Sequence, residues 1–97
     1  MRIEVLDRAT EDLIDGFHFY EAQETGLGSY FLESLYADIE LLTIYAGIHE
    51  RIYKHYFRLL SLRFPFAVFY TVHEDTVFIQ AILDCRRDPA WVRERLA

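Results

Sequence analysis

Arginine and lysine residues are concentrated in the second half of a chain that is acidic overall. The 97 residues carry a formal net charge of −6. Residues 1–50 contain two arginines and eleven acidic residues, hence −9, whereas residues 51–97 contain eight basic and five acidic residues, hence +3. Guanidinium groups bind phosphate and carboxylate through parallel N–H donors. The pattern indicates either a site for a nucleic-acid backbone or an acidic protein partner, or separate ion pairs with the acids of the first half. The basic residues are Arg51, Lys54, Arg58, Arg63, Arg86, Arg87, Arg93 and Arg95.

Four of these residues occupy positions that an antiparallel sheet would bring together. Arg58 lies near the start of one expected strand and Arg63 near its end, while Arg86 and Arg87 follow the last expected strand directly. At one end of a sheet their charges would converge on an anion. Asp84, two residues before Arg86, is an acid among these arginines. It is placed to pair with them and to reduce their availability.

The sequence contains no pattern typical of a metal or cofactor site. The four histidines have no metal-ligand spacing with one another or with Cys85, and a structural zinc site needs four convergent ligands. No glycine-rich loop that would cradle a phosphate is present. Catalysis by Cys85 would need a base and an orienting group that the sequence does not place beside it, although the adjacent arginines would lower the pKa of an exposed thiol there. We expect no metal and no cofactor.

The elements that must position these residues follow from periodicity. Residues 2–6 alternate polar and apolar side chains, which predicts a short strand. Residues 7–26 and 28–47 repeat apolar side chains at three- and four-residue steps, which predicts two amphipathic helices. The short "TGLG" connection makes them an antiparallel hairpin.

The second half has strand composition. Residues 52–57, 58–64, 66–72 and 77–83 are rich in β-branched and aromatic side chains, and "HEDT" between the last two runs is hairpin-sized. "DPAWVRERL" predicts a turn and a short C-terminal helix or tail. We expect one α+β domain over residues 1–97: an N-terminal strand, and a helical hairpin packed on one face of a small, mainly antiparallel sheet of three or four strands.

Composition bears on where the protein works and on whether it has a partner. Hydrophobic residues make up 53% and aromatic residues 16% of the chain, more than a domain of this length hides easily. Either the core is unusually aromatic, or part of this surface waits for a partner. A single cysteine, the lack of a visible secretory signal and the shortness of the apolar run "FPFAVFYTV" favour a soluble cytoplasmic protein without membrane contact.

Several segments, in order, resemble one family. "RFPFAVFYTV", "VFIQAILDCRRDPAWVRERL" and the N-terminal "A..DL.....FYE....GLG..FL..L...I" resemble the RelE/ParE toxin superfamily of bacterial type II toxin–antitoxin (plasmid stabilisation) modules, over nearly the whole chain. "FPF" and "RRDPAW" resemble the ParE-like branch more closely. The resemblance implies a helical hairpin on a small sheet, and a small antitoxin that wraps and neutralises the toxin.

Two toxin activities follow from the resemblance. ParE-like members inhibit DNA gyrase by binding, and RelE-like members cleave mRNA on the ribosome. RNA cleavage needs a general base, a leaving-group acid and cations on the phosphate. Here it would rest on Lys54, Arg63 and Arg86, with Tyr53, His55 or Tyr56 as substitutes for the Tyr or His that is missing after Trp91. The low count of lysines, Asp84 and the net charge of −6 favour the gyrase activity.

We therefore expect a growth-inhibiting ParE-like toxin that is not an enzyme, with gyrase and an antitoxin as partners and no direct DNA binding alone. The alternatives are a RelE-like endoribonuclease acting with ribosome and mRNA, or an inactive stand-alone member of the family. The expected contacts with target or antitoxin are Arg58, Arg86, Arg87, Trp91, Phe17, Tyr20 and Phe31.

Overall fold

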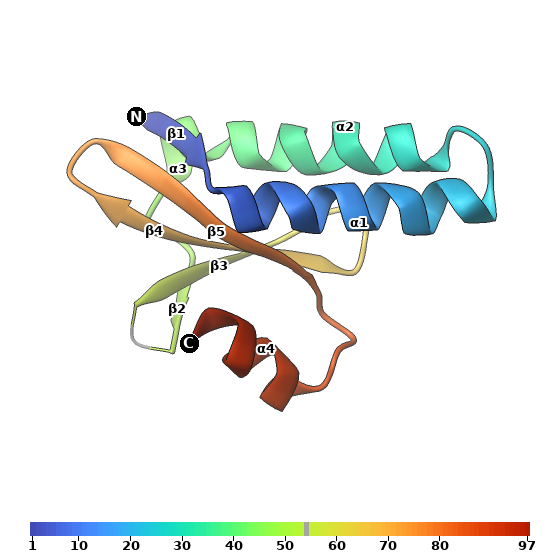
Figure 1. Cartoon of the computed structure of the whole chain (residues 1–97). Helices are drawn as coiled ribbons and strands as arrows, with labels where there is room; N and C mark the ends of the chain where they lie inside the picture. The colour runs from blue at the N-terminus through green and yellow to red at the C-terminus, as the bar shows by residue number, and fades with distance from the viewer. Residues whose placement is uncertain (54) are drawn as a thin grey trace.

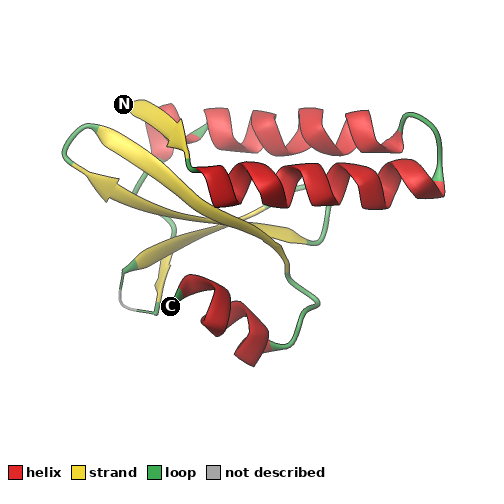
Figure 2. Ribbon diagram, in the orientation of Figure 1, coloured by secondary structure: helices red, strands yellow, loops and turns green. Residues whose placement is uncertain are grey.

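A helical hairpin lies on one face of a five-stranded sheet and a short C-terminal helix lies on the other (Figure 1, Figure 2). The computed structural model describes residues 1–53 and 55–97. The strands are β1 (Arg2–Val5), β2 (Glu50–Ile52), β3 (Tyr56–Leu60), β4 (Phe66–His73) and β5 (Thr76–Asp84). The helices are α1 (Asp7–Gln23), α2 (Leu27–Glu40), α3 (Leu42–Tyr45) and α4 (Pro89–Leu96). The predicted α+β class, the N-terminal strand and the helical hairpin are confirmed.

The sheet has the order β1-β5-β4-β3-β2. β1 pairs with β5 in parallel, and every other neighbouring pair is antiparallel. The antiparallel neighbours β4 and β5 are those that the "HEDT" turn predicts. Opposite Phe69 and Tyr70 of β4 the register shifts, because Ala81 and Ile79 are their partners and Gln80 is extra. Such a bulge lets Ile79 and Ile82 both face the helical hairpin.

The face of the sheet beneath α1 and α2 forms the larger core. Phe31 is fully buried, with its ring 4.9 Å from that of Phe66 and 5.2 Å from that of Phe64 between centroids. Tyr20 packs against the same rings. Gly16 of α1 faces Phe31 so closely that an added Cβ would lie 2.5 Å from the ring. These aromatic side chains fill the core. Of the two alternatives that the composition left open, the unusually aromatic core is therefore present.

The opposite face of the sheet is covered by α4, the short C-terminal helix whose position the sequence leaves open. Val92 and Leu96 of α4 pack on Phe69 and Leu83 of the central strands. Tyr56 donates a hydrogen bond through Oη to the carbonyl oxygen of Leu96 at 2.6 Å. Because β4 is apolar on both faces, its second face needs a cover of its own, and the short amphipathic C-terminus supplies it.

Two strand boundaries differ from those predicted. The runs 52–57 and 58–64 become the shorter strands β2 and β3, antiparallel to each other. Tyr53 interrupts the expected first strand with a φ of 51°, a left-handed conformation that ends strand pairing. The chain after Leu60 leaves the sheet as a loop that runs to Phe66.

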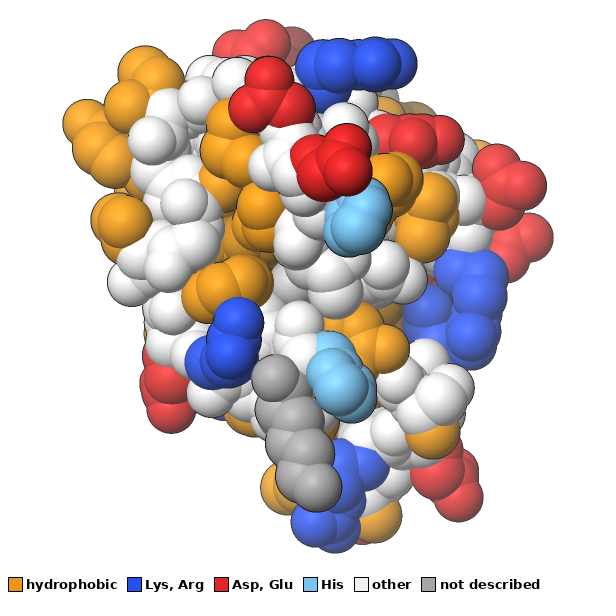
Figure 3. Space-filling view, turned by 90° about the vertical axis from the view of Figure 1, so that its left-hand side faces the viewer, with side chains coloured by type: hydrophobic (Ala, Val, Ile, Leu, Met, Phe, Trp, Pro, Cys, Tyr) orange, Lys and Arg blue, Asp and Glu red, His pale blue; other side chains and the backbone are white. Residues whose placement is uncertain are grey.

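Large apolar side chains also remain at the surface. Ile44 is 75% and Ile48 72% exposed, and Met1 is 43% exposed. They belong to the end of the molecule with the N-terminus and α3, where hydrophobic side chains form separate areas among acidic ones (Figure 3). No helix in residues 1–53 or 55–97 is both long and apolar enough to cross a membrane.

Candidate functional site

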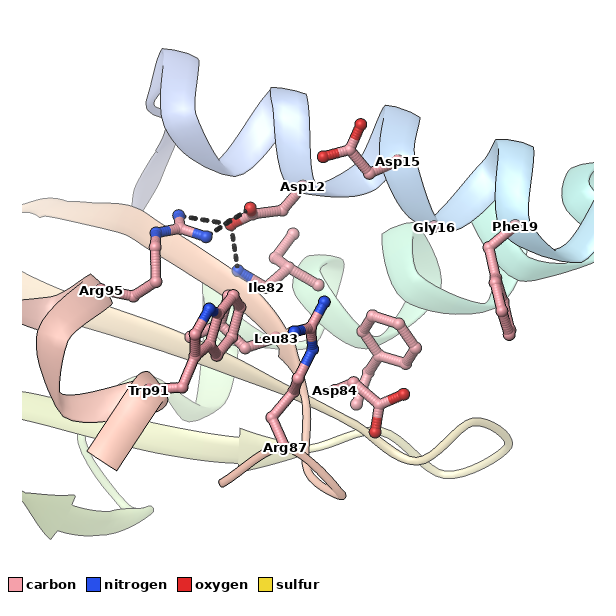
Figure 4. A pocket seen from close by; sticks show the side chains of 11 residues that line it. Asp12, Asp15, Gly16, Phe19, Ile82, Leu83, Asp84, Arg87, Trp91 and Arg95 are labelled. Atoms are coloured by element: carbon pink, nitrogen blue, oxygen red, sulfur yellow. Dashed lines mark hydrogen bonds and ion pairs between the residues drawn. The ribbon is translucent and has the colours of Figure 1, made fainter. Parts of the chain in front are cut away.

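A cleft of about 500 Å³ lies where α1, the end of β5 and α4 meet (Figure 4). Its floor is apolar, with Phe66, Ile82 and Leu83 from the central strands. Its walls mix acids and arginines with two aromatic side chains. The wall residues are Asp12, Asp15, Gly16 and Phe19 from α1, and Asp84, Arg87, Trp91 and Arg95 from β5 and the C-terminal segment.

One end of this cleft is closed by an ion pair between α1 and α4. Arg95 donates from Nη1 and Nη2 to the two carboxylate oxygens of Asp12, at 2.7 and 2.9 Å. The backbone N–H of Ile82 donates to Asp12 as well, at 3.0 Å. Only 18% of the Arg95 side chain and 10% of the Asp12 side chain are exposed. The hydrogen bonds to Asp12 raise the pKa of Arg95. This pair is structural, because each charge faces its counter-charge within the molecule, although Arg95 Nε is buried without a hydrogen bond to the described residues.

At the other end, Asp84 binds Arg86. The guanidinium donates from Nε and Nη2 to the two carboxylate oxygens at 3.0 and 2.7 Å, and the Arg86 N–H donates to Oδ1 at 2.8 Å. These hydrogen bonds lower the pKa of Asp84 below its usual range. The expected pairing of Asp84 with its neighbouring arginines is therefore present for Arg86. Its donors face a carboxylate of its own chain, which leaves fewer of them for an outside anion.

Arg87 has a different environment. Its guanidinium carbon lies 4.3 Å from the centroid of the Trp91 ring, a cation–π contact within the C-terminal segment. Trp91 is half-buried beside Val92 and Leu96. Arg87 and Trp91 therefore present a joined cationic and aromatic surface at the rim of the cleft (Figure 4).

Arg58 approaches Arg87 from the other side. Both residues line a smaller pocket of about 120 Å³, together with Asp84 and Cys85. Arg58 donates to Glu50 of the neighbouring strand at 3.0 Å. Burial raises the pKa of the Cys85 thiol and the Asp84 charge adds to the rise, whereas the Arg58 charge lowers it less, so the net shift is upward and not downward as the adjacent arginines led us to expect. A raised pKa disfavours the reactive thiolate.

The remaining predicted site residues do not join this group. Arg63 lies in the β3–β4 loop, with its guanidinium carbon 5.9 Å from the centroid of the Tyr30 ring of α2. It therefore belongs to the helical-hairpin side of the sheet, whereas Arg58 belongs to the α4 side. Lys54 lies outside the described residues. Among the described residues, Arg58 and Arg87 share a pocket with Asp84, which pairs with Arg86, whereas Arg63 lies apart from them.

The three aromatic residues expected to contact an antitoxin are more buried than a groove would require. Phe31 is fully buried and Tyr20 is 8% exposed, so both are core residues. Phe17 is half-buried, with its ring edge-on to His18. The sequence pattern could not distinguish an apolar face that meets the sheet from one that meets a partner. The neighbouring Phe19 is 54% exposed, so it presents to solvent the aromatic surface that was expected of Tyr20.

Asp12 and Asp15 carried no signal of their own in the sequence, because they are ordinary charged residues of an amphipathic helix. Arg95 belongs to the basic set, and its ion pair with Asp12 is one of the pairs with acids of the first half that the charge pattern indicates. Only the packing of α4 against α1 brings these residues together. Within residues 1–53 and 55–97, no three His, Cys, Asp or Glu side chains are grouped so that they could hold a metal ion.

A helical hairpin on one face of a small, mainly antiparallel sheet is the RelE/ParE-like fold that the resemblance implies. One solved structure of this kind is a chain of the "Chromosomal ParDE TA system from P. aeruginosa", which superposes with a TM-score of 0.78 and 16% sequence identity. The match covers 84% of this chain and 92% of that chain. No protein-family model and no curated protein matches the sequence. At this identity the likeness establishes a ParE-like fold.

Proposed function

We propose that the protein is the toxin of a type II toxin–antitoxin module, that it inhibits DNA gyrase by binding, and that a cognate antitoxin neutralises it. The ParE-like fold and its likeness to a chain of a ParDE system support the toxin assignment. Binding rather than catalysis is the proposed mode of action.

The observation that carries this choice is the ion pair between Asp84 and Arg86. A ribonuclease needs cations that are free to stabilise the charge on the phosphate during cleavage. Arg86 donates two side-chain hydrogen bonds to the Asp84 carboxylate of its own chain. Arg63 lies beside α2, on the other side of the sheet from Arg58. Arg63 and Arg86, the two described arginines of the expected ribonuclease site, therefore form no joint phosphate clamp, and the net charge of −6 adds repulsion toward RNA.

The surface of Arg87 and Trp91 suits a protein target. Arginine and tryptophan are the residue types that most often dominate the free energy of protein–protein binding. The two side chains are already in contact, at 4.3 Å, so less conformational entropy is lost when a partner binds them. We assign gyrase to this surface, with Arg58 at its border.

Induction in a bacterial host with a DNA-damage reporter tests the proposal. We expect growth arrest with the reporter switched on, because a stalled gyrase leaves broken DNA. Arrest with a silent reporter and cleaved mRNA would contradict it in favour of ribosome-dependent cleavage. Absence of arrest in hosts of several species would contradict it in favour of an inactive member of the fold.

A further inference from the structure

Helix α2 buries a carboxylate, one oxygen of which has no hydrogen-bond partner among the residues that the structure describes. Asp38 is 5% exposed, and its Oδ2 atom is buried without a hydrogen bond. Ser34, one turn earlier, is also 5% exposed, and its Oγ atom is buried without a hydrogen bond. Both side chains line a pocket of about 260 Å³ between α2 and the β3–β4 loop.

Such a carboxylate is costly to the fold. A buried charge without a partner loses its hydration and gains nothing in return. Asp38 also lies in the last turn of α2, where the partial negative charge of the helix end disfavours an acid, and that turn contains no basic residue. A cation in the pocket would remove both penalties at once.

The rest of the pocket is apolar apart from one arginine. Ala37 and Leu41 come from α2, and Leu62, which is 84% exposed, comes from the loop. Arg63 also lines the pocket, yet its guanidinium lies over the Tyr30 ring and forms no ion pair with Asp38 in the described structure. An acceptor pair at the bottom and aliphatic side chains at the rim fit a cationic head on an aliphatic stem.

The charge of the surrounding surface points to a basic partner. Residues 7–40, which contain α1 and α2, hold nine acids and one base, Arg8. Among these acids, Asp12 is held by Arg95. A partner segment with basic residues would therefore be attracted to this side of the molecule.

We propose that the pocket between α2 and the β3–β4 loop binds the side chain of a lysine or arginine of a partner protein. The charged head pairs with Asp38 and Ser34, and the stem lies on Leu41 and Leu62. This site is separate from the surface of Arg87 and Trp91. It does not depend on the identity of the toxin's target, so the two proposals can fail independently.

Titration of the full chain with small probes tests the pocket. The probes are n-butylammonium and n-butylguanidinium, with uncharged n-butylurea as the matched control, and the readout is the NMR shift of the Leu41 and Leu62 methyl groups. We expect saturable shifts with the two cations and none with the urea. The stronger cation identifies the head group as that of lysine or of arginine. Asp38→Asn should weaken binding roughly tenfold, as loss of a charge-assisted hydrogen bond does, whereas the exposed Glu40→Gln should leave it unchanged.

A stability measurement complements the titration. Without probe, Asp38→Asn should raise the unfolding temperature, because it removes an unpaired buried charge. If this variant does not fold, Leu62→Ala replaces it. The exposed Leu62 side chain does not contribute to the core, and its loss should weaken the binding of both cations severalfold. Equal binding of the urea, or equal weakening by Glu40→Gln, would overturn the proposal. Coupling between Asp38→Asn and Arg63→Gln in a double-mutant cycle would also overturn it, because Arg63 itself would then fill the pocket.

Discussion

Arg95 and Asp12, 83 positions apart in the sequence, form a doubly hydrogen-bonded ion pair that fastens the C-terminal helix to the first one. Together with the hydrogen bond from Tyr56 to Leu96, it holds α4 across the second face of the sheet. The wall of the cleft that carries Trp91 depends on this attachment.

Removal of one partner of this pair should destabilise the fold. Asp12→Ala leaves the Arg95 charge largely buried and the N–H of Ile82 without its acceptor. We expect a loss of roughly 3 kcal/mol in the free energy of unfolding, measured by urea denaturation. Asp15→Ala, one turn away and exposed, is the control and should change stability little. Equal losses in the two variants would show that the pair does not hold α4.

The Asp84–Arg86 pair should make stability depend on pH in the acid range. The pKa of Asp84 is lowered in the folded state from about 3.8 in the unfolded chain. Its contribution is therefore complete above the unfolded value and is lost as the pH falls through the folded pKa. We expect Asp84→Asn to be less stable than the wild type at pH 7, and the difference to disappear as the pH falls below 3.8 and through the lowered folded pKa. A difference that persists at low pH would exclude a charge effect.

His49 should produce a second pH dependence near neutrality. Its Nδ1 atom lies 2.6 Å from Tyr70 Oη, which also accepts the N–H of Gly47 at 3.0 Å. Burial lowers the pKa of His49 below 6.5, so the neutral ring stabilises the fold above that value and the stabilisation is lost as the pH falls through the folded pKa. Thermal unfolding at pH 7 and pH 5 should show a larger drop for the wild type than for His49→Asn. The exposed His18→Asn should behave like the wild type.

Gly16 should tolerate no side chain. An alanine Cβ there would lie 2.5 Å from two atoms of the buried Phe31 ring. We expect Gly16→Ala to destabilise the protein by roughly 1–3 kcal/mol through overpacking, although alanine favours a helix. His18→Ala, exposed on the same helix, is the matched control. A stabilised Gly16→Ala variant would mean that α1 and α2 pack less closely than the structure has them.

The contrast between these residues explains what could be predicted from the sequence. The helical hairpin and the strands follow from periodicity, which is local information. The pairing of Asp84 with Arg86 is equally local, because a single residue separates them. The position of α4 is not local. It depends on the burial of Phe69 and Leu83 by α4, and which strand residues need to be buried on this face becomes clear only when the sheet is assembled.

The aromatic residues of the helices show a second limit of prediction from the sequence. Phe17, Tyr20 and Phe31 lie on apolar helix faces, and periodicity cannot reveal whether such a face meets the sheet or a partner. The structure buries Phe31 completely and leaves Phe19 exposed. The orphan carboxylate of Asp38 is likewise a property of packing, since an acid on a helix normally faces water.

The central claim is that Arg87 and Trp91 contact gyrase. Its most direct measurement is inhibition of DNA supercoiling by purified gyrase, titrated with wild type, Arg87→Ala, Trp91→Ala and Arg93→Ala. Arg93 is exposed on the same helix, so it controls for the loss of one positive charge. We predict inhibition by the wild type and Arg93→Ala, and at least about tenfold weaker inhibition by the other two, the factor expected when interface hot spots are lost. Inhibition by Arg87→Ala and Trp91→Ala at wild-type strength, or no inhibition by the wild type, would contradict this account.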